Sequence, residues 1–242
     1  MKLFKKCVFV IHGFGGALWE NEYLVNEFTR KGFDVYAYTL PGHEKDVLGG
    51  VKYEEWIKSS EDKLKELLNE YLNVYVIGCS MGGVIATYLT SKYKRIRKLI
   101  LLAPAFEYAN FEKYGKDLKF WDKEKVKVPK ESVYKEILSK MFRVSLFSIF
   151  EFTKLVKKYS EYAYELTNKT LILIGDIDEI VPIKCYEYLK NAMPIPDILS
   201  FTLVKDGAHR LLAGNRKEDV TNYIYNYIIG GLRWKKMKKS VL

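Results

Sequence analysis

The sequence has few cysteines, few histidines and no long apolar run, and each scarcity narrows the class of protein. Only three of its 242 residues are cysteine, an odd number without metal-ligand spacing, which indicates reduced thiols and no metal site. The longest apolar runs have strand length or are interrupted by charge, so we expect no integral membrane segment. No signal-peptide pattern is visible at the start, and we therefore expect a cytoplasmic protein.

Acidic residues are also in the minority, with 30 Asp and Glu against 40 Lys and Arg and a net charge of +10. The lysines are spread along the chain beside glutamates, which is typical of solvated helix faces, and no nucleic-acid motif accompanies them. The only basic block is the tail at 233–239. We expect it to be a frayed, solvated terminus, with weak contact to an anionic surface as the alternative. Nothing distinguishes a monomer from a homodimer.

The hydrophobic content of 48% is ample for one core in a chain of this length. Strand-like and helix-like segments alternate, and several strands are almost entirely apolar, as in a parallel sheet covered on both faces. This predicts a doubly wound α/β domain. The expected strands are 7–11, 33–39, 73–77, 97–103, 170–174 and 198–204, and the expected helices are 18–31, 53–72, 82–93, 183–192 and 216–229.

One interval, 105–165, breaks this alternation and contains no clear strand. A loop that long needs a structure or a function of its own. We predict a helical cap over the carboxyl ends of the strands, inserted into a core formed by 1–104 and 166–242. Its aromatic residues, Phe106 and Phe147 among them, are candidates for binding an apolar acyl chain, although packing of the cap onto the core explains many of them equally well.

The segment Gly78-Cys79-Ser80-Met81-Gly82-Gly83 follows an apolar strand and precedes a helix. A G-x-S-x-G pattern in this context predicts a sharp strand-to-helix turn that exposes a serine hydroxyl. The flanking glycines suit it because strand and helix backbones come close together there. Ser80 is therefore the candidate nucleophile.

A serine nucleophile needs a base, and the chain offers three histidines. His209 follows the last expected strand, from which a loop residue can reach back over the sheet, and is the candidate base. His12 follows the first strand and is expected to bond to nearby backbone. His43 lies in Leu40-Pro41-Gly42-His43 and is expected to stabilise a turn.

The acid that orients the base is sought in the loop after strand 170–174, which contains three carboxylates. Asp178 is the candidate, because it lies further into the loop with Ile180 and Val181 behind it to exclude water. Asp176 lies nearer the strand end, where it could instead stabilise the turn. Glu179 is the remaining alternative.

Acyl transfer also needs donors for the developing oxyanion. The backbone N–H of Met81, directly after the serine, is one expected donor. The second is expected from His12-Gly13-Phe14-Gly15-Gly16, with the Phe14 N–H as the donor, Gly13 allowing close approach and the Phe14 ring lining the acyl pocket. The loop lacks the spacing of a phosphate-binding motif.

Together these segments resemble the α/β-hydrolase superfamily, and within it the compact carboxylesterases and monoacylglycerol lipases. The segments that carry the resemblance run in family order from residue 9 to about 229: His12–Gly16, Leu40–His43, Gly78–Gly83, Ala103–Ala105, Gly175 to Pro182, and Gly207–His209. The order Ser80, Asp178, His209 is the family's order. The family's first two strands have no counterpart, which implies a minimal, mostly parallel sheet of about six strands.

The resemblance implies a serine esterase that forms an acyl-enzyme on Ser80, needs no cofactor or metal, and acts on short- to medium-chain acyl esters or monoacylglycerols. Related hydrolases remain alternatives: a thioesterase, a lysophospholipase, or a proline-type aminopeptidase with a cap carboxylate for the substrate amine. A non-catalytic binding module is the alternative outside the enzymes, although such proteins usually lose triad residues.

Overall fold

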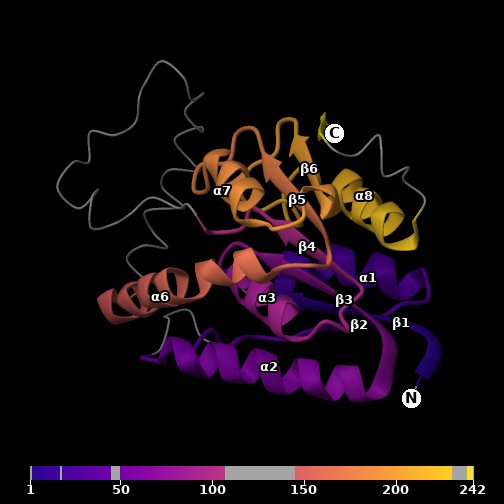
Figure 1. Ribbon diagram of the computed structural model, residues 1–242, viewed down its shortest axis with the longest axis horizontal. Helices are drawn as coiled ribbons and strands as arrows, with labels where there is room; N and C mark the ends of the chain where they lie inside the picture. The colour runs from indigo at the N-terminus through magenta and orange to yellow at the C-terminus, as the bar shows by residue number, and fades with distance from the viewer. Residues whose placement is uncertain (1, 17, 45–49, 107–144, 231–238, 242) are drawn as a thin grey trace.

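The computed structural model describes residues 2–16, 18–44, 50–106, 145–230 and 239–241, and the structural statements that follow refer to these residues. They form a seven-stranded sheet in the order β2-β1-β3-β4-β5-β6-β7, with every neighbouring pair parallel (Figure 1). The strands are β1 (Lys2–Ile11), β2 (Asp34–Ala37), β3 (Tyr71–Cys79), β4 (Lys98–Leu102), β5 (Lys169–Gly175), β6 (Leu199–Val204) and β7 (Lys239–Val241).

All six expected strands are present, and the sheet has one strand more. The short β7 pairs with β6 at the edge of the sheet, where we expected a frayed tail; positions 233–238 of that tail lie outside the described residues. β1 also begins earlier than predicted, at Lys2. The prediction missed this start because the first four residues of β1 are exposed and lack the apolar pattern of a buried strand.

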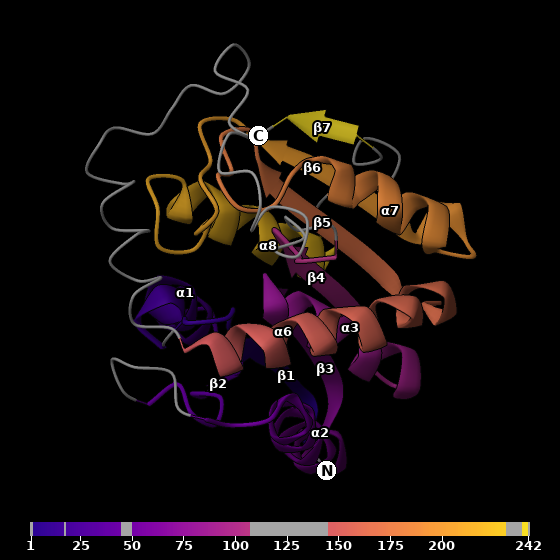
Figure 2. The same cartoon turned by 90° about the vertical axis from the view of Figure 1, so that its left-hand side faces the viewer.

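The expected helices are present as well, and they cover both faces of the sheet (Figures 1 and 2). α1 and α8 pack on one face, while α2, α3, α6 and α7 lie on the other. The helices are η1 (Leu18–Asn21), α1 (Glu22–Arg30), α2 (Tyr53–Glu70), α3 (Met81–Lys92), α6 (Leu146–Tyr159), η2 (Ser160–Glu165), α7 (Lys184–Ala192), η3 (Pro196–Ile198) and α8 (Lys217–Ile229).

The strands separate two apolar cores because successive side chains of a strand point to opposite faces. In β1, Phe9 and Ile11 belong to the core beneath α2 and α3, whereas Val8 and Val10 belong to the core beneath α1 and α8. All four are fully buried. This explains the nearly continuous apolar strands of the sequence and fixes the sheet between its two helical layers.

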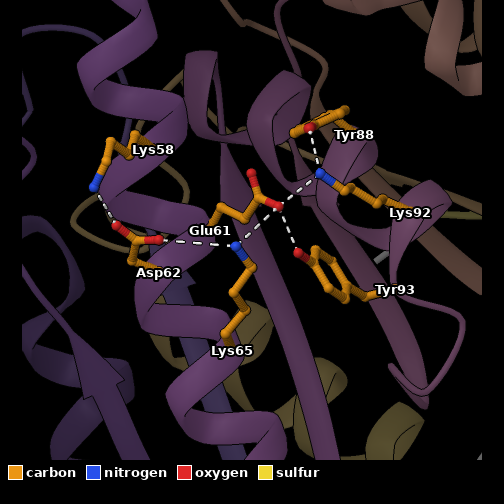
Figure 3. A network of polar contacts seen from close by, with 7 residues as sticks. All are labelled: Lys58, Glu61, Asp62, Lys65, Tyr88, Lys92 and Tyr93. Atoms are coloured by element: carbon orange, nitrogen blue, oxygen red, sulfur yellow. Dashed lines mark hydrogen bonds and ion pairs between the residues drawn. The ribbon is translucent and has the colours of Figure 1, made fainter.

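A polar network joins α2 to the carboxyl end of α3 (Figure 3). Glu61 of α2 accepts hydrogen bonds from the Lys92 ammonium, at 2.7 Å, and from the Tyr93 hydroxyl, and Lys65 lies 3.5 Å from the same carboxylate. The Glu61 side chain is 13% exposed, so this network is better shielded than an ordinary surface ion pair. The network links α2 to the carboxyl end of α3, the helix that begins directly after Ser80.

Of the predicted cap, positions 107–144 lie outside the described residues, positions 105–106 form a turn, and Leu146–Glu165 are helical, as expected. α6 packs against α2 and α3. Buried Glu151 of α6 accepts a 3.2 Å hydrogen bond from the backbone N–H of Tyr53, the first residue of α2. A carboxylate is well suited to that place, since the N–H groups of a first turn lack intrahelical partners. The division into core and cap stays a prediction.

No helix within the described ranges has the length and apolarity to cross a membrane.

Candidate active site

Ser80 lies at the junction of β3 and α3 in a backbone conformation that few side-chain-bearing residues adopt. Its φ is 51° and its ψ is −117°. A non-glycine residue there costs on the order of 1–3 kcal/mol, so the surroundings must hold it. They do: the Ser80 N–H donates to Leu102 O at 2.9 Å, and its carbonyl accepts from Gly83 N–H at 2.9 Å and Ala105 N–H at 3.1 Å. The predicted strand-to-helix turn is confirmed.

The two glycines flanking Ser80 are required by close backbone contacts. A Cβ on Gly78 would lie 2.4 Å from the Gly82 carbonyl oxygen, and one on Gly82 would lie 2.2 Å from the Ile11 carbonyl oxygen. Both overlaps involve backbone, which no side-chain rotation can relieve. Without side chains at these positions, the start of α3 can lie directly against the end of β1.

His209 and Asp178 meet above the carboxyl ends of β5 and β6. The His209 Nδ1 lies 3.1 Å and 3.0 Å from the two Asp178 carboxylate oxygens, and the two side chains are 10% and 1% exposed. An ionised carboxylate only accepts hydrogen bonds, so Nδ1 carries the proton and the neutral ring keeps its lone pair on Nε2. Nε2 is the atom with which a histidine base removes a proton.

Asp178 is itself held by two backbone donors. Its Oδ1 accepts from Ile180 N–H at 2.9 Å and from Val181 N–H at 2.8 Å. The Val181 side chain is buried, that of Ile180 is 42% exposed, and the Asp178 side chain between them and the histidine is 1% exposed. The backbone N–H groups of this segment therefore fix the Asp178 carboxylate. The hydrophobicity of the sequence does not predict these hydrogen bonds.

The two competing carboxylates occupy different places. The Asp176 side chain is exposed, and its backbone N–H donates to Val204 O at 3.0 Å, in keeping with a role in the turn. Glu179 does contact the histidine, but at its main chain: Glu179 Oε2 accepts a 3.1 Å hydrogen bond from the His209 N–H. Sequence reasoning gave Glu179 no such role, because nothing in the pattern links it to a backbone amide thirty residues away.

Opposing influences act on the pKa of His209. Burial by itself lowers it, whereas the charge of Asp178, the hydrogen bond to that carboxylate, and the charges of Glu179 and Glu20 raise it. The raising influences prevail, so the pKa lies above the ordinary histidine value of about 6.5.

The other two histidines have the roles expected of them. His12 Nε2 accepts the Leu40 N–H at 2.9 Å, and His12 Nδ1 donates to Gly13 O at 2.8 Å. Both ring nitrogens are thus engaged, and burial lowers the pKa of His12 to about 4. His43 lies in a turn closed by its N–H to Leu40 O, with its ring Nδ1 3.2 Å from Pro41 O.

The His12 hydrogen bond also orients the loop after β1. Gly13 O accepts from the His12 ring and from Gly16 N–H at 3.1 Å, so the Gly13–Phe14 peptide is held at its carbonyl. The described chain contains no cis peptide bond, and in a trans peptide the Phe14 N–H points away from that carbonyl. The ideal Cβ position of Gly13 lies 3.6 Å from Ser80 Oγ, which puts this peptide beside the serine.

The aromatic candidates lie in different settings. The Phe14 ring stacks on Phe152 of α6, with centroids 4.9 Å apart, and meets Trp56 edge-on. Phe106 is 7% exposed and stacks on Tyr188 of α7, which is a packing contact, whereas Phe147 on α6 is 43% exposed. α6 therefore contacts the loop after β1.

Ser80 and His209 share the carboxyl edge of the sheet, since β3, β5 and β6 are parallel. Within the described part of the chain, the Ser80 hydroxyl makes no hydrogen bond to the His209 ring. Such hydrogen bonds are often long in free enzymes and shorten when substrate binds. Across the same residues, no three His, Cys, Asp or Glu side chains gather as a metal site would require.

Solved structures of similar architecture include lipases and esterases. A metagenome-derived lipolytic enzyme from a study of LipS and LipT is 16% identical, with 95% of this chain and 96% of that chain covered and a TM-score of 0.72. The monoacylglycerol lipase of Paleococcus ferrophilus is 18% identical over 95% and 97% of the chains, with a TM-score of 0.69. A soluble variant of Saccharomyces cerevisiae monoglyceride lipase is 17% identical over 96% and 89%, with a TM-score of 0.70. These likenesses confirm the α/β-hydrolase fold.

The protein-family model described as serine aminopeptidase, S33, matches residues 4–215. The chain belongs to this family of α/β-hydrolases. A comparison with curated protein sequences gave no match. The family and the fold make the chain a hydrolase, while its substrate has to be argued from the site.

Proposed function

We propose that the chain is a serine hydrolase that cleaves carboxylic esters through an acyl-enzyme on Ser80. The observation that supports this most is the buried Asp178–His209 pair, which leaves His209 Nε2 as an acceptor at the sheet edge where Ser80 lies half-buried in its turn. No cofactor is needed for this chemistry.

In the proposed reaction, His209 Nε2 takes the Ser80 proton as Oγ attacks the ester carbonyl carbon. The carbonyl oxygen becomes an oxyanion, for which the Phe14 and Met81 N–H groups are the proposed donors. Collapse of this intermediate breaks the bond to the alcohol, which leaves with the proton from His209. A water molecule then gives its proton to His209 and attacks the acyl carbon. The second collapse releases the acid and returns the proton to Ser80.

The proposed substrates are short- to medium-chain acyl esters or monoacylglycerols. The Phe14 ring, stacked on Phe152, offers an apolar surface that suits an acyl chain, on the loop whose Gly13 lies beside Ser80. The similar structures include lipases named for monoacylglycerol and monoglyceride. Phe147 is kept as a proposed substrate contact on α6, and Phe106 is better explained by its packing on α7.

The aminopeptidase alternative requires a cap carboxylate that is available to a substrate amine. Within the described part of the cap, Glu151 already accepts from Tyr53 N–H and pairs with Lys154 at 2.8 Å, and Glu161 and Glu165 are exposed. Glu151 is thus already engaged, and the exposure of Glu161 and Glu165 does not by itself favour a peptide substrate over an ester.

Hydrolysis of p-nitrophenyl esters from acetate to palmitate, by wild-type and Ser80→Ala protein, tests the proposal. We expect activity to peak at one chain length and to fall by at least about 10³-fold in the variant, because its nucleophile is lost. A fluorophosphonate probe should label wild-type protein and leave Ser80→Ala unlabelled. A wild-type protein that neither turns over any ester nor reacts with the probe would favour the binding module instead.

The rate should depend on pH through His209. Because its pKa is raised and only the neutral ring can accept the serine proton, we expect kcat/KM to fall about tenfold per pH unit on the acid side, with a midpoint above 6.5. A pH profile measured with one p-nitrophenyl ester, read at the isosbestic wavelength of the product, gives this midpoint. A midpoint below 6.5 would contradict the assigned environment of His209.

A further inference from the structure

Two consecutive carboxylates of the segment after β5 hold the same histidine at two points. Asp178 bonds to the His209 ring, and Glu179 accepts the N–H of the His209 main chain at 3.1 Å. The proposed reaction uses only the first of these contacts. A hydrogen bond between a backbone N–H and an ionised carboxylate is among the stronger kinds in proteins, so the second contact needs an explanation.

The segment that carries His209 has little regular structure to hold it. It lies between β6 and α8, and Asp206 within it has a positive φ of 55°. Main-chain contacts join the end of β6 and the start of this segment to the segment after β5: Asp176 N–H donates to Val204 O at 3.0 Å, and Ile177 N–H donates to Gly207 O at 3.2 Å. Beyond Gly207, the hydrogen bond from the His209 N–H to Glu179 continues this connection up to the base itself.

The residue after the base is held from the opposite side. Arg210 pairs with Glu20 of η1, with Nε and Oε1 3.1 Å apart, and its guanidinium lies over the Trp19 ring at 5.4 Å. The His209 N–H is thus bonded to Glu179 in the segment after β5, while the neighbouring Arg210 is paired with Glu20 in the segment after β1. The acidic groups that act on the His209 ring are Asp178, Glu179 and Glu20, and Arg210 is the adjacent cation.

We propose that Glu179 is a positioning residue for the base. Its carboxylate fixes the main chain of His209, so that the ring, oriented at Nδ1 by Asp178, is held where Nε2 can reach the Ser80 hydroxyl. This inference rests on the proposed function, in which His209 is the base. A ring bonded only at Nδ1 can still shift with its loop, and a misplacement of about 1 Å can cost on the order of 10²-fold in rate.

Two variants separate the hydrogen bond from the charge. Glu179→Ala removes both, and we expect kcat to fall about 10- to 100-fold with KM within about twofold of wild type. Glu179→Gln keeps an oxygen that accepts the His209 N–H. We expect it to retain most of kcat but to shift the acid midpoint of the pH profile downward, because a charge that raises the pKa of His209 is gone.

Glu187→Gln is the matched control. Glu187 is exposed on the nearby α7, and its substitution removes the same charge as Glu179→Gln does. It should leave kcat and the pH midpoint unchanged. Thermal unfolding of every variant shows whether Glu179→Ala is folded; if it is not, Glu179→Gln and its pH midpoint carry the test. An unchanged kcat in folded Glu179→Ala, or a loss that Glu179→Gln does not restore, overturns the proposal.

A direct NMR titration of the His209 ring keeps this inference separable from the proposed function. The His209 signals, assigned by their absence in His209→Ala, should titrate at lower pH in Glu179→Gln than in wild type and Glu187→Gln. This readout does not require ester hydrolysis. Lack of activity with a shifted titration would count against the esterase alone, whereas an unshifted titration in an active enzyme would overturn the role of Glu179.

Discussion

Asp178→Asn is expected to lower kcat/KM for ester hydrolysis by about 10⁴-fold while leaving the fold intact. The Asp178 Oδ1 accepts two backbone hydrogen bonds, from Ile180 and Val181, and an asparagine would keep its own oxygen there. Its NH₂ group would then face His209 Nδ1. Because that group only donates, Nδ1 would have to accept, the ring proton would move to Nε2, and the base could no longer take the Ser80 proton.

Asp176→Asn provides the matched control, since Asp176 lies two residues away with its side chain exposed. Its kcat/KM should stay within about threefold of wild type, because its contact with the β6 segment is made by its backbone N–H. Steady-state kinetics of the two variants on one ester gives the answer. The reverse result, an active Asp178→Asn and an inactive Asp176→Asn, would show that the acid is assigned to the wrong carboxylate.

Gly175→Ala should produce the largest loss of stability. A Cβ at this position would lie 1.8 Å from the Gly207 carbonyl oxygen and 2.4 Å from the Gly207 carbonyl carbon. Backbone overlaps of this depth cannot be relieved by a rotamer change, so we expect the free energy of unfolding to fall by about 3 kcal/mol or more. Activity should fall too, because the contact joins the segments that carry Asp178 and His209.

Gly50→Ala is the control for this substitution. Among the described residues, no atom beyond its chain neighbours would lie within 4 Å of a Cβ on Gly50, so the free energy of unfolding of Gly50→Ala should change by less than about 1 kcal/mol. Urea unfolding followed by circular dichroism measures both variants. A Gly175→Ala protein as stable and active as wild type would mean that the two segments can separate without loss, and that their close approach does not hold the site together.

Local pattern determined the parts of this protein that depend on neighbours in sequence. Apolar strands alternating with helices predicted the doubly wound parallel sheet, because burial on both faces requires such strands. The glycines around Ser80 predicted the turn, since no larger residue fits between strand and helix there. The scarcity of histidine made His209 the candidate base, and its position after the last long strand predicted that it lies at the carboxyl edge of the sheet, where it contacts Asp178.

Only the tertiary structure decided which groups far apart in sequence meet. It shows Asp178 held by the backbone N–H groups of Ile180 and Val181, and Glu179 bonded to the main chain of His209. It also shows Phe14 stacked on Phe152 of α6, and a seventh strand at the edge of the sheet. The physical reason is common to these cases. A sequence pattern reports the burial and backbone preference of each residue, whereas a hydrogen bond or a stacked ring depends on the relative position of two segments, which only packing fixes.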